Sequence, residues 1–491
     1  MTITLRDKAQ ARCSWLPDLD AWRALHHPSS NRSAADNKTP RYKALADALA
    51  AAIQQGELQP DTRLPPQRLL ADALEVTTGT VTRAYAEAER RGLVEARVGS
   101  GTYVRVVQAD DRPDFYHLMA EGGDGSIDLS LSLMVPCPLR LQSLHQAMQQ
   151  VAADPQQLAA ALAYQSERGQ PRQLQVFADW LQRLGVKVNP EQMIITDGGQ
   201  HGIFLSLQAL LAPGELLVSD ALTYPGVIAA ARELHLRHQG LPLDEEGLDT
   251  HALERLCQQQ RPRAVYLMPD QNNPTGRVLS PARRQHLAEL AERYDFWIIE
   301  DAVQFLPPEF RLQRLADLAP QRTLYLFSSS KILAGGLRVG LIAAPAGILP
   351  RLMAALRAHC WMAPPLMVAL TCAWIESGET DRLLRWQWQE VQARQQLLGE
   401  VLAGQVYSRH PAGFVVWLSL PGDWRAGEFV RAAADAGVRV LAAEPFCVGN
   451  QAVPRAVRLC VSPPAERELL KEGLLRLKHL LESPPQGRAV F

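Results

Sequence analysis

The residues with the clearest capacity for chemistry stand just after short apolar segments in the second half of the chain. The pair Gly198-Gly199 follows Met193-Ile194-Ile195, and a helix is expected after it. Asp301 closely follows Phe296–Ile299, and Lys331 directly follows three consecutive serines. A glycine turn at the start of a helix offers free backbone N–H groups to a phosphate. Ligands of open α/β sheets bind beyond the carboxyl ends of the strands, where Asp301 falls.

Three more segments extend this set: Asn273-Pro274-Thr275-Gly276, Gly336-Leu337-Arg338-Val339-Gly340, and Arg458 near the end of the chain. Taken singly, each residue has an ordinary interpretation. Lys331 is then a surface lysine, Asn273 part of a turn, Arg458 a charge at a strand edge and Asp301 a helix N-cap. Their occurrence together, in this order, favours one shared site.

The segments that must position these residues alternate between two patterns from Ile127 onward. Short apolar runs of strand type are separated by longer stretches with helical periodicity. The clearest runs are Met193-Ile194-Ile195, Leu216-Leu217-Val218, Ala264-Val265-Tyr266-Leu267 and Phe296-Trp297-Ile298-Ile299. Fully apolar strands between helices predict an α/β domain with a mainly parallel central sheet, covered on both faces.

The block before this domain has a different, compact helical pattern. A first helix is predicted from Pro40 to just before Gly56, with Tyr42, Leu45, Ala46, Leu49 and Ile53 on one face. Two short helices follow, and two short strands form a wing. The predicted ranges are Gln67–Leu74 and Thr80–Arg91 for the helices, and Leu93–Ala96 and Thr102–Val104 for the strands. Two short helices joined by a tight turn form a helix-turn-helix.

Length and composition indicate more than one domain. At 491 residues with 47% hydrophobic residues, the chain exceeds one ordinary domain. We divide it into a polar, poorly ordered extension (1–37), a winged helix-turn-helix domain (38–105), a linker (106–126) and a large domain (127–485). The net charge of −1 leaves DNA binding to a local basic surface.

Cysteine usage and hydropathy indicate the compartment. The 7 cysteines contain no CxxC pair, so no disulfide framework and no metal site are expected. The chain opens without a signal peptide pattern, and its longest apolar run, near Leu366–Ile375, is too short for a bilayer. These features predict a cytoplasmic protein without membrane contact.

The N-terminal block resembles the DNA-binding domain of the GntR family. The resemblance rests, in order, on Gly56-Glu57-Leu58-Gln59-Pro60, Arg63-Leu64-Pro65-Pro66-Gln67-Arg68, Thr80-Val81-Thr82-Arg83-Ala84-Tyr85 and Gly99-Ser100-Gly101-Thr102-Tyr103-Val104. It implies binding to double-stranded DNA. The expected phosphate contacts are Arg63, Arg68 and Arg83; the residues expected at base edges are Thr78, Gly79, Thr80 and Thr82; those of the wing are Gly99, Ser100 and Gly101. Pro66 and Thr77-Thr78-Gly79 depart from the usual pattern, which leaves the operator open. A helical bundle that docks on protein is the alternative.

The segments of the large domain resemble fold-type I aminotransferases across nearly all of Ile127–Ser483. The resemblance implies pyridoxal 5'-phosphate as cofactor, with Lys331 as the lysine that bonds to it covalently. Asp301 would keep the pyridine nitrogen protonated, Asn273 would donate to the phenolic oxygen, and Arg458 would bind a ligand carboxylate. Tyr224 would stack on the ring, and the phosphate would be held by Gly199, Gln200, Ser328 and Arg338. Tyr164 resembles a residue that reaches the phosphate of a partner subunit.

The combination of the two parts resembles the MocR subfamily of bacterial regulators. This resemblance implies a transcription regulator that senses pyridoxal phosphate or an amino compound, assembled as a head-to-tail homodimer that reads two half-sites. The alternative is an active aminotransferase with an appended DNA-binding module. Aminotransferases of this fold usually carry a Tyr soon after the aspartate, whereas Asp301 is followed by Ala302-Val303-Gln304-Phe305. The absent Tyr favours weak, partial or absent transamination.

Overall fold

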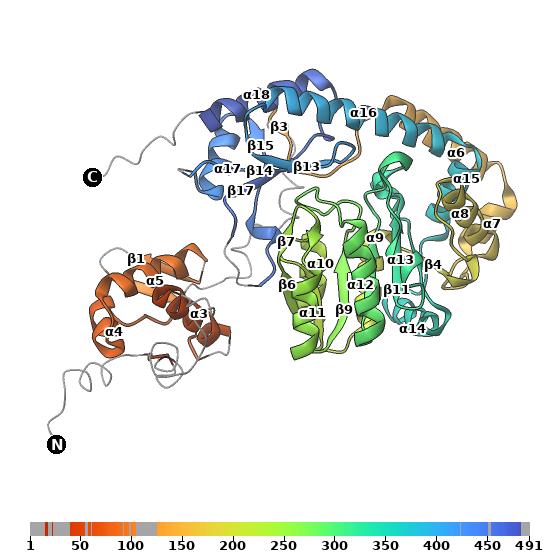
Figure 1. Ribbon diagram of the computed structural model, residues 1–491. Coiled ribbons are helices and arrows are strands. Elements are labelled where there is room, and N and C mark those ends of the chain that lie inside the picture. Colours follow the sequence, from red (N-terminus) through yellow and green to blue (C-terminus); the bar gives the residue numbers. More distant parts are fainter. Residues whose placement is uncertain are drawn as a thin grey trace. The chain divides into compact units, whose positions relative to one another are not determined.

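The computed structural model describes residues 15–17, 22, 40–54, 57–59, 61–91, 93–97, 100–104, 125–422, 424–449 and 453–482. These residues fall into two compact units, which divide near residue 120 (Figure 1). This boundary falls within the linker, 106–126, that we expect from the sequence. The predicted linker falls almost wholly outside the described residues.

The first unit is a winged helix-turn-helix. Its elements are α3 (Arg41–Gln54), α4 (Gln67–Leu74), α5 (Thr78–Arg90), β1 (Val94–Arg97) and β2 (Gly101–Val104). The helix α3 buries Leu45, Ala46 and Leu49 against the others, as its periodicity predicts. β1 and β2 pair antiparallel to form the wing. The prediction was wrong at the start of α5, which begins two residues before Thr80 because the Thr77 side chain caps it.

The segment before this domain contributes to its core. The sequence predicts a poorly ordered extension over 1–37. Trp15 and Trp22 are nevertheless buried, at 8% and 6% exposed, in the same apolar cluster as α3, α4 and α5. The indole N–H of Trp22 lies 3.4 Å from the backbone oxygen of Leu74. The expectation of poor order is therefore wrong for Trp15 and Trp22, because burying two large rings stabilises the domain.

The second unit is built on a seven-stranded sheet. Six of its strands run in the same direction, and β12 is antiparallel to both of its neighbours. In sheet order the strands are β4 (Met193–Thr196), β12 (Gly340–Ala343), β11 (Thr323–Ser328), β10 (Trp297–Asp301), β9 (Pro262–Leu267), β5 (Leu216–Asp220) and β6 (Arg237–Leu241). The mainly parallel sheet predicted from the sequence is confirmed, and β10 extends far enough to include Asp301.

Helices cover both faces of this sheet, which explains why its strands are apolar throughout. Residues such as Leu217, Tyr266 and Ile299 face one group of helices, and Val218 and Val265 face the other. The first group is α9 (Gly198–Leu210), α10 (Pro225–Glu233) and α14 (Leu349–His359). The second is α8 (Pro171–Arg183), α11 (Thr250–Gln259), α12 (Pro281–Tyr294), α13 (Leu315–Leu318) and α15 (Pro365–Glu376).

A smaller antiparallel sheet completes the unit. Its strands, in order, are β13 (Tyr407–Arg409), β14 (Val415–Ser419), β17 (Ala456–Cys460) and β16 (Leu441–Ala442). The long helix α16 (Glu379–Val401) packs on this sheet with α17 (Ala426–Asp435) and α18 (Arg467–Glu482). The remaining elements are α6 (Pro138–Ala152), α7 (Pro155–Leu162), the pair β3 (Ile127–Asp128) and β15 (Val438–Arg439), and the hairpin β7 (Leu243–Asp244) and β8 (Gly247–Leu248). Among the described helices, none combines the length and apolarity that crossing a membrane requires.

Candidate functional site

The predicted site residues of the large domain gather where the parallel strands end. Asp301 is the last residue of β10 and Ser328 the last of β11, while Lys331 ends a short 3-10 helix that follows. The glycine turn after β4 opens α9 at the same edge, because β4 runs parallel to β11 across the antiparallel β12. The carboxyl edge of the sheet is the ligand-binding edge of open α/β folds.

Lys331 carries an amine that is tuned toward its neutral form. Burial lowers the pKa of Lys331 to about 8; Cys460 opposes that shift, and the cations Arg458 and Arg338 add to it. Its Nζ donates to the backbone oxygen of Ser132. A neutral lysine amine near physiological pH is a nucleophile for carbonyl compounds, as the sequence-based role requires.

Asp301 is a buried carboxylate held on both oxygens. Oδ2 accepts a hydrogen bond of 2.7 Å from the hydroxyl of Tyr266, and Oδ1 accepts one of 3.0 Å from the backbone N–H of Val303. Burial raises the pKa of Asp301 to about 6, against the opposing effects of these two donors and of Lys331. The N-cap interpretation is excluded, because Asp301 ends a strand that a loop follows. Tyr266 was not predicted; it lies on the adjacent strand, and only the strand register reveals its proximity.

A cradle fit for a phosphate lies at the start of α9. A Cβ added at Gly198, where φ is +79°, would stand 2.5 Å from an Nη atom of Arg338, and one at Gly199 would stand 3.2 Å from the Cβ of Ser328. Arg338 donates to the backbone oxygen of Asp197 over 3.2 Å. The two glycines therefore leave space that side chains would fill, beside one hydroxyl and one guanidinium. The predicted group of Gly199, Ser328 and Arg338 is brought together.

Gln200 and Tyr224 meet at the neighbouring turn before α10. The side-chain N–H of Gln200 donates to the backbone oxygen of Gly226 over 2.9 Å. A Cβ at Gly226 would come within 2.2 Å of the Tyr224 ring. Among the described residues, Oε1 of Gln200 is a buried oxygen without a hydrogen-bond partner. Such an unsatisfied polar atom fits a site completed by a bound group.

Arg458 and Asn273 bring the small sheet to the same edge. Arg458 lies in β17, fully buried between β14 and β16, so it is not a strand-edge charge. Its Nη1 donates to Oδ1 of Asn273 over 3.2 Å, its Nη2 donates to the backbone oxygen of Ser130, and its guanidinium lies 4.9 Å from the centre of the Phe446 ring. With Oδ1 facing Arg458, the amide N–H₂ of Asn273 is the group left to donate to a ligand.

The position where a tyrosine is usual is filled by an amide. Gln304 is 6% exposed, and its Nε2 lies 3.4 Å from Oγ of Ser132. Val303, the alternative register, instead packs among the apolar residues of the sheet. Gln304 therefore contacts the same residue whose backbone oxygen accepts from Lys331, and it supplies no phenolic hydroxyl there.

His201 lies beside the glycine turn without taking part in it. Its Nδ1 accepts from the backbone N–H of Asp197 over 3.0 Å, and Cys360 lies 3.9 Å from its Nε2. Burial, and then His359, lower the pKa of His201 to about 4, so the ring is neutral with its proton on Nε2. That proton occupies the lone pair that a metal shared with His359 and Cys360 would need. His201 is a satisfied structural group, as predicted.

The predicted DNA contacts of the first unit are mostly exposed. Arg68 on α4 and Arg83 on α5 are exposed, as are Thr78, Gly79 and Thr82, and Thr80 is half-buried. The Thr82 hydroxyl donates to Gln67 of α4 over 2.7 Å, which ties the two helices together. In the wing, Ser100 bonds to the hydroxyl of Tyr103, and a Cβ at Gly101 would stand 3.0 Å from Nε of Arg63. Gly99 lies outside the described residues.

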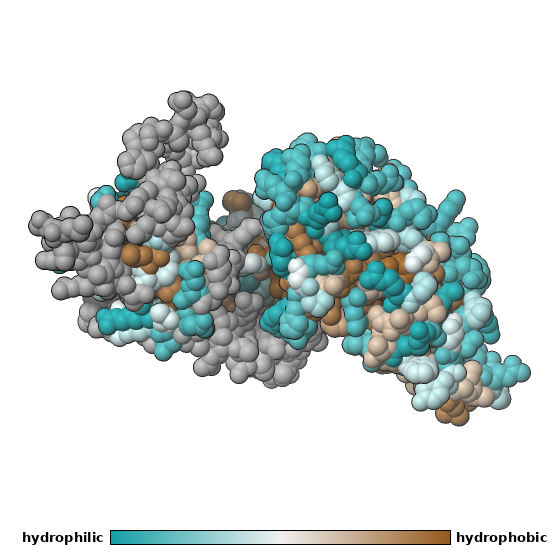
Figure 2. Space-filling model, turned by 90° about the horizontal axis from the view of Figure 1, so that it is seen from below, coloured by the Kyte–Doolittle hydropathy of each residue, from teal (hydrophilic) through white to brown (hydrophobic). Residues whose placement is uncertain are grey.

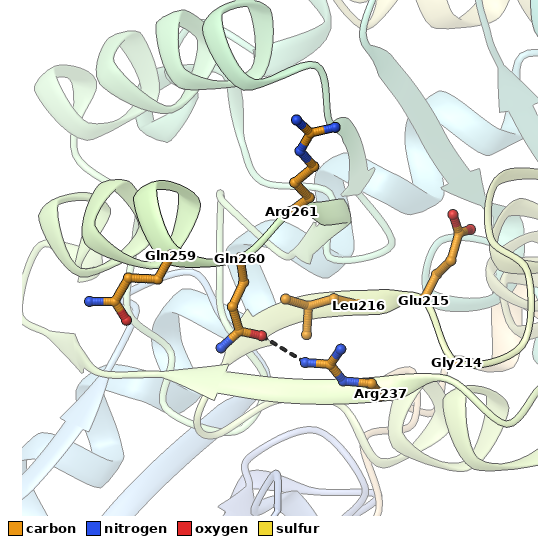
Figure 3. Close-up of a pocket in the computed structure, with 7 residues that line it drawn as sticks. All are labelled: Gly214, Glu215, Leu216, Arg237, Gln259, Gln260 and Arg261. Carbon is orange, nitrogen blue, oxygen red and sulfur yellow. Dashed lines mark hydrogen bonds between the residues drawn. The ribbon is translucent and has the colours of Figure 1, made fainter.

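One hollow of about 490 Å³ lies elsewhere, at the amino ends of β5, β6 and β9 (Figure 3). It is lined by Gly214, Glu215, Leu216, Arg237, Gln259, Gln260 and Arg261. Arg237 and Gln260 bond to each other across it over 2.7 Å. This hollow is at the opposite edge of the sheet from Asp301 and Lys331, so it does not belong to the candidate site.

Comparison with known proteins gives two family matches. Residues 136–477 match the model of aminotransferase class I and II, and residues 41–104 match that of bacterial regulatory proteins of the gntR family. The chain is 31% identical over 458 residues to the uncharacterized HTH-type transcriptional regulator YdeF of Bacillus subtilis (strain 168), covering 93% of this chain and 98% of that protein. It is 26% identical over 335 residues to the probable rhizopine catabolism regulatory protein MocR of Rhizobium meliloti, covering 63% and 66% of the two chains.

Among solved structures, the chain is similar to LysN, an α-aminoadipate aminotransferase of Thermus thermophilus. The TM-score is 0.68 at 27% identity, over 76% of this chain and 95% of that one. That structure was solved with N-(5'-phosphopyridoxyl)-L-leucine bound. The aminotransferase fold predicted for the large domain is confirmed.

Proposed function

We propose that this chain is a DNA-binding transcription regulator controlled through pyridoxal 5'-phosphate. It belongs to the MocR subfamily of GntR-type regulators, which carry an aminotransferase class I and II domain. One observation carries the proposal. The same chain has an exposed recognition helix and a sheet edge at which the buried Asp301, the half-buried Lys331 and the exposed Arg338 are each held by defined partners.

The residues of the edge suit this cofactor. When bound, pyridoxal phosphate supplies a carbonyl carbon that reacts with amines and a ring that accepts electrons. The neutral amine of Lys331 would bond it covalently, and Asp301 would face its ring nitrogen. The glycine turn with Ser328 and Arg338 would hold the phosphate, and Tyr224 the face of the ring. Asn273 would donate to the phenolic oxygen.

The effector is proposed to be pyridoxal phosphate itself or an amino compound that reacts with it. Arg458 supports a carboxylate on such a compound, since a guanidinium presents two parallel donors to one. The Gln304 amide, in the place of a phenol, supports binding without efficient turnover, because the cofactor's phenolic oxygen then has one strong neutral donor fewer. A regulator needs the ligand to shift a conformational equilibrium and has no need to release a product.

A homodimer is proposed from an exposed apolar face of the large unit. The helices α6, α7 and α15 pack together, and Figure 2 shows apolar side chains at the surface on the side where Figure 1 places α6 and α7. The residues of this apolar face are Leu139, Leu141, Met148, Leu158, Leu162, Tyr164, Trp361 and Leu366, between 40% and 91% exposed. Exposed apolar side chains gathered on one group of packed helices are typical of subunit interfaces. A head-to-tail pair would bring Tyr164 toward the partner's phosphate and pair the two DNA readers.

The dimer is tested by sedimentation of a variant with Leu141→Glu and Leu162→Glu. We expect a monomer at micromolar concentration, whereas the wild type and Val406→Glu, which charges an equally exposed valine elsewhere, should stay dimeric. A wild type that sediments as a monomer with cofactor present contradicts the proposal.

We propose that the protein acts in the cytoplasm. Its regulatory role is tested by fluorescence anisotropy. The probes are a labelled duplex from the region upstream of the chain's own gene and a scrambled duplex of equal length. We expect preference for the first, a strong decrease of affinity with salt, and a change of affinity when pyridoxal phosphate is added. Equal affinity for both duplexes, with and without cofactor, contradicts the role.

The second candidate is a working aminotransferase with an appended DNA-binding domain. The similarity to LysN over 95% of that chain favours it. The two candidates make opposite predictions for the rate of steady-state turnover with an amino donor and a keto-acid acceptor.

A further inference from the structure

Tyr266 and Asp301 lie on neighbouring strands and face the same side of the sheet. In the parallel register Tyr266 stands opposite Ile299, one pleat before Asp301. Tyr266 is completely buried and Asp301 is 6% exposed. The 2.7 Å between the Tyr266 hydroxyl and Oδ2 is the length expected of a strong hydrogen bond to a carboxylate.

The direction of this hydrogen bond is fixed by the surrounding groups. Burial raises the pKa of Tyr266 well above its usual range; Asp301 adds to the rise, and Tyr224 and Asp220 contribute further. The hydroxyl therefore stays protonated and donates. Lys331 faces Asp301 and, when protonated, lowers the pKa of that carboxyl, and Val303 supplies the other donor through its backbone.

We propose that Tyr266 is a positioning residue that holds Asp301 ionised and aimed at the heterocyclic nitrogen of the bound cofactor. The inference rests on the proposed function, since it concerns how the chain binds pyridoxal phosphate. A carboxylate in a dry site tends to take up a proton, and a protonated Asp301 could not stabilise a protonated ring nitrogen. Donors on both oxygens oppose that uptake and fix the plane of the carboxylate, while each oxygen keeps a lone pair for the ring.

The test substitutes Tyr266→Phe, which removes only the hydroxyl oxygen. Tyr325→Phe is the matched control. Tyr325 is a buried tyrosine on β11, 3% exposed, and it pairs with Glu300, so it faces the opposite side of the sheet from Asp301. The probe is pyridoxamine phosphate, which has the same ring nitrogen and phosphate but cannot bond to Lys331, so titration of that amine does not limit binding.

Dissociation constants are measured from pH 5.5 to 9. Because binding strengthens as Asp301 loses its proton, affinity for the wild type should rise through about pH 6. Loss of one charged hydrogen bond should move this midpoint upward by about one to two pH units in Tyr266→Phe. The control should keep the wild-type midpoint. An unchanged midpoint in folded Tyr266→Phe, or an equal shift in the control, overturns the inference.

Two further measurements complete the design. In an Asp301→Asn background, adding Tyr266→Phe should cause little further loss of affinity, and a fully additive loss would show that Tyr266 acts elsewhere. If Tyr266→Phe does not fold, the infrared difference between wild type and Asp301→Asn at pH 7.5 decides: an ionised carboxylate band is expected, and a protonated one overturns the inference. Failure of the wild type to bind pyridoxamine phosphate at any pH would contradict the proposed function itself.

Discussion

The cofactor edge and the DNA-reading face are built in opposite ways. At the edge, Asp301 and Arg458 are buried and bonded to several partners, and Lys331 is enclosed beside them. On the face, Arg68 and Arg83 project from short helices into solvent. A ligand that is to be recognised atom by atom needs side chains fixed beforehand, since disorder costs binding free energy. A duplex is held largely through its phosphates, which long exposed arginines can follow.

The comparison predicts how substitutions at each region should behave. At the edge, one misplaced atom should abolish or strongly weaken binding. On the face, one lost charge should lower affinity modestly and reduce the slope of log affinity against log salt.

The largest effect is expected for Lys331→Ala. The variant lacks the only amine that faces Asp301 among the described residues, so covalent attachment of pyridoxal phosphate should be lost completely. Borohydride treatment followed by mass spectrometry measures attachment. Wild-type protein should retain the cofactor mass and the variant should not; retention in the variant would place the covalent link on another lysine.

Gly198→Ala tests how closely the phosphate cradle is fitted. Its Cβ would stand 2.5 Å from Arg338, so the guanidinium must move, and loss of one charged hydrogen bond should weaken cofactor binding about 10- to 100-fold. Gly214→Ala is the control, because its φ of +83° gives the same backbone strain in open space. Equal dissociation constants for the two variants would show that only backbone strain is involved.

The pH dependence of attachment tests the enclosure of Lys331. The pKa of its amine is lowered to about 8, and only the neutral amine reacts. The initial rate of covalent attachment to the apoprotein should therefore rise about tenfold per pH unit below 8 and level off above it. A rate that climbs until pH 10 is that of an ordinary exposed lysine, and it would remove the special role of this amine.

The smallest effects belong to the DNA-reading face. Arg68→Ala and Arg83→Ala should each lower the slope of log affinity against log salt by about one unit, since each would remove one proposed phosphate contact. Arg351→Ala, an exposed arginine on α14, is the control and should leave the slope unchanged. Slopes unchanged in all three variants would move the DNA contact to another surface.

Much of the fold follows from local pattern. Apolar runs between helical stretches predict the sheet. The glycine, serine and lysine motifs, through their resemblance to aminotransferases, predict most of the residues that the structure brings together at its edge. The features that could not be predicted from the sequence depend on contacts between residues distant in the chain. Tyr266 stands 35 residues before Asp301, and only the pairing of Ile299 with Tyr266 brings them together. Trp15 and Trp22 lie among polar residues, so the mean hydropathy of the N-terminal segment does not indicate that these two side chains are buried.

Steady-state turnover tests the central claim most directly. The purified chain, loaded with pyridoxal phosphate, is assayed with a panel of amino acids and amines and a common keto-acid acceptor. Gln304 stands where a tyrosine is usual, so no tyrosine hydroxyl at this position donates to the cofactor's phenolic oxygen. A fast catalytic cycle needs that oxygen and the substrate held in one geometry. We predict release of product well below one turnover per second, together with a ligand-dependent change in operator affinity. Turnover of about 1–10³ per second, the ordinary range of enzymes, would contradict the sensor and establish the aminotransferase.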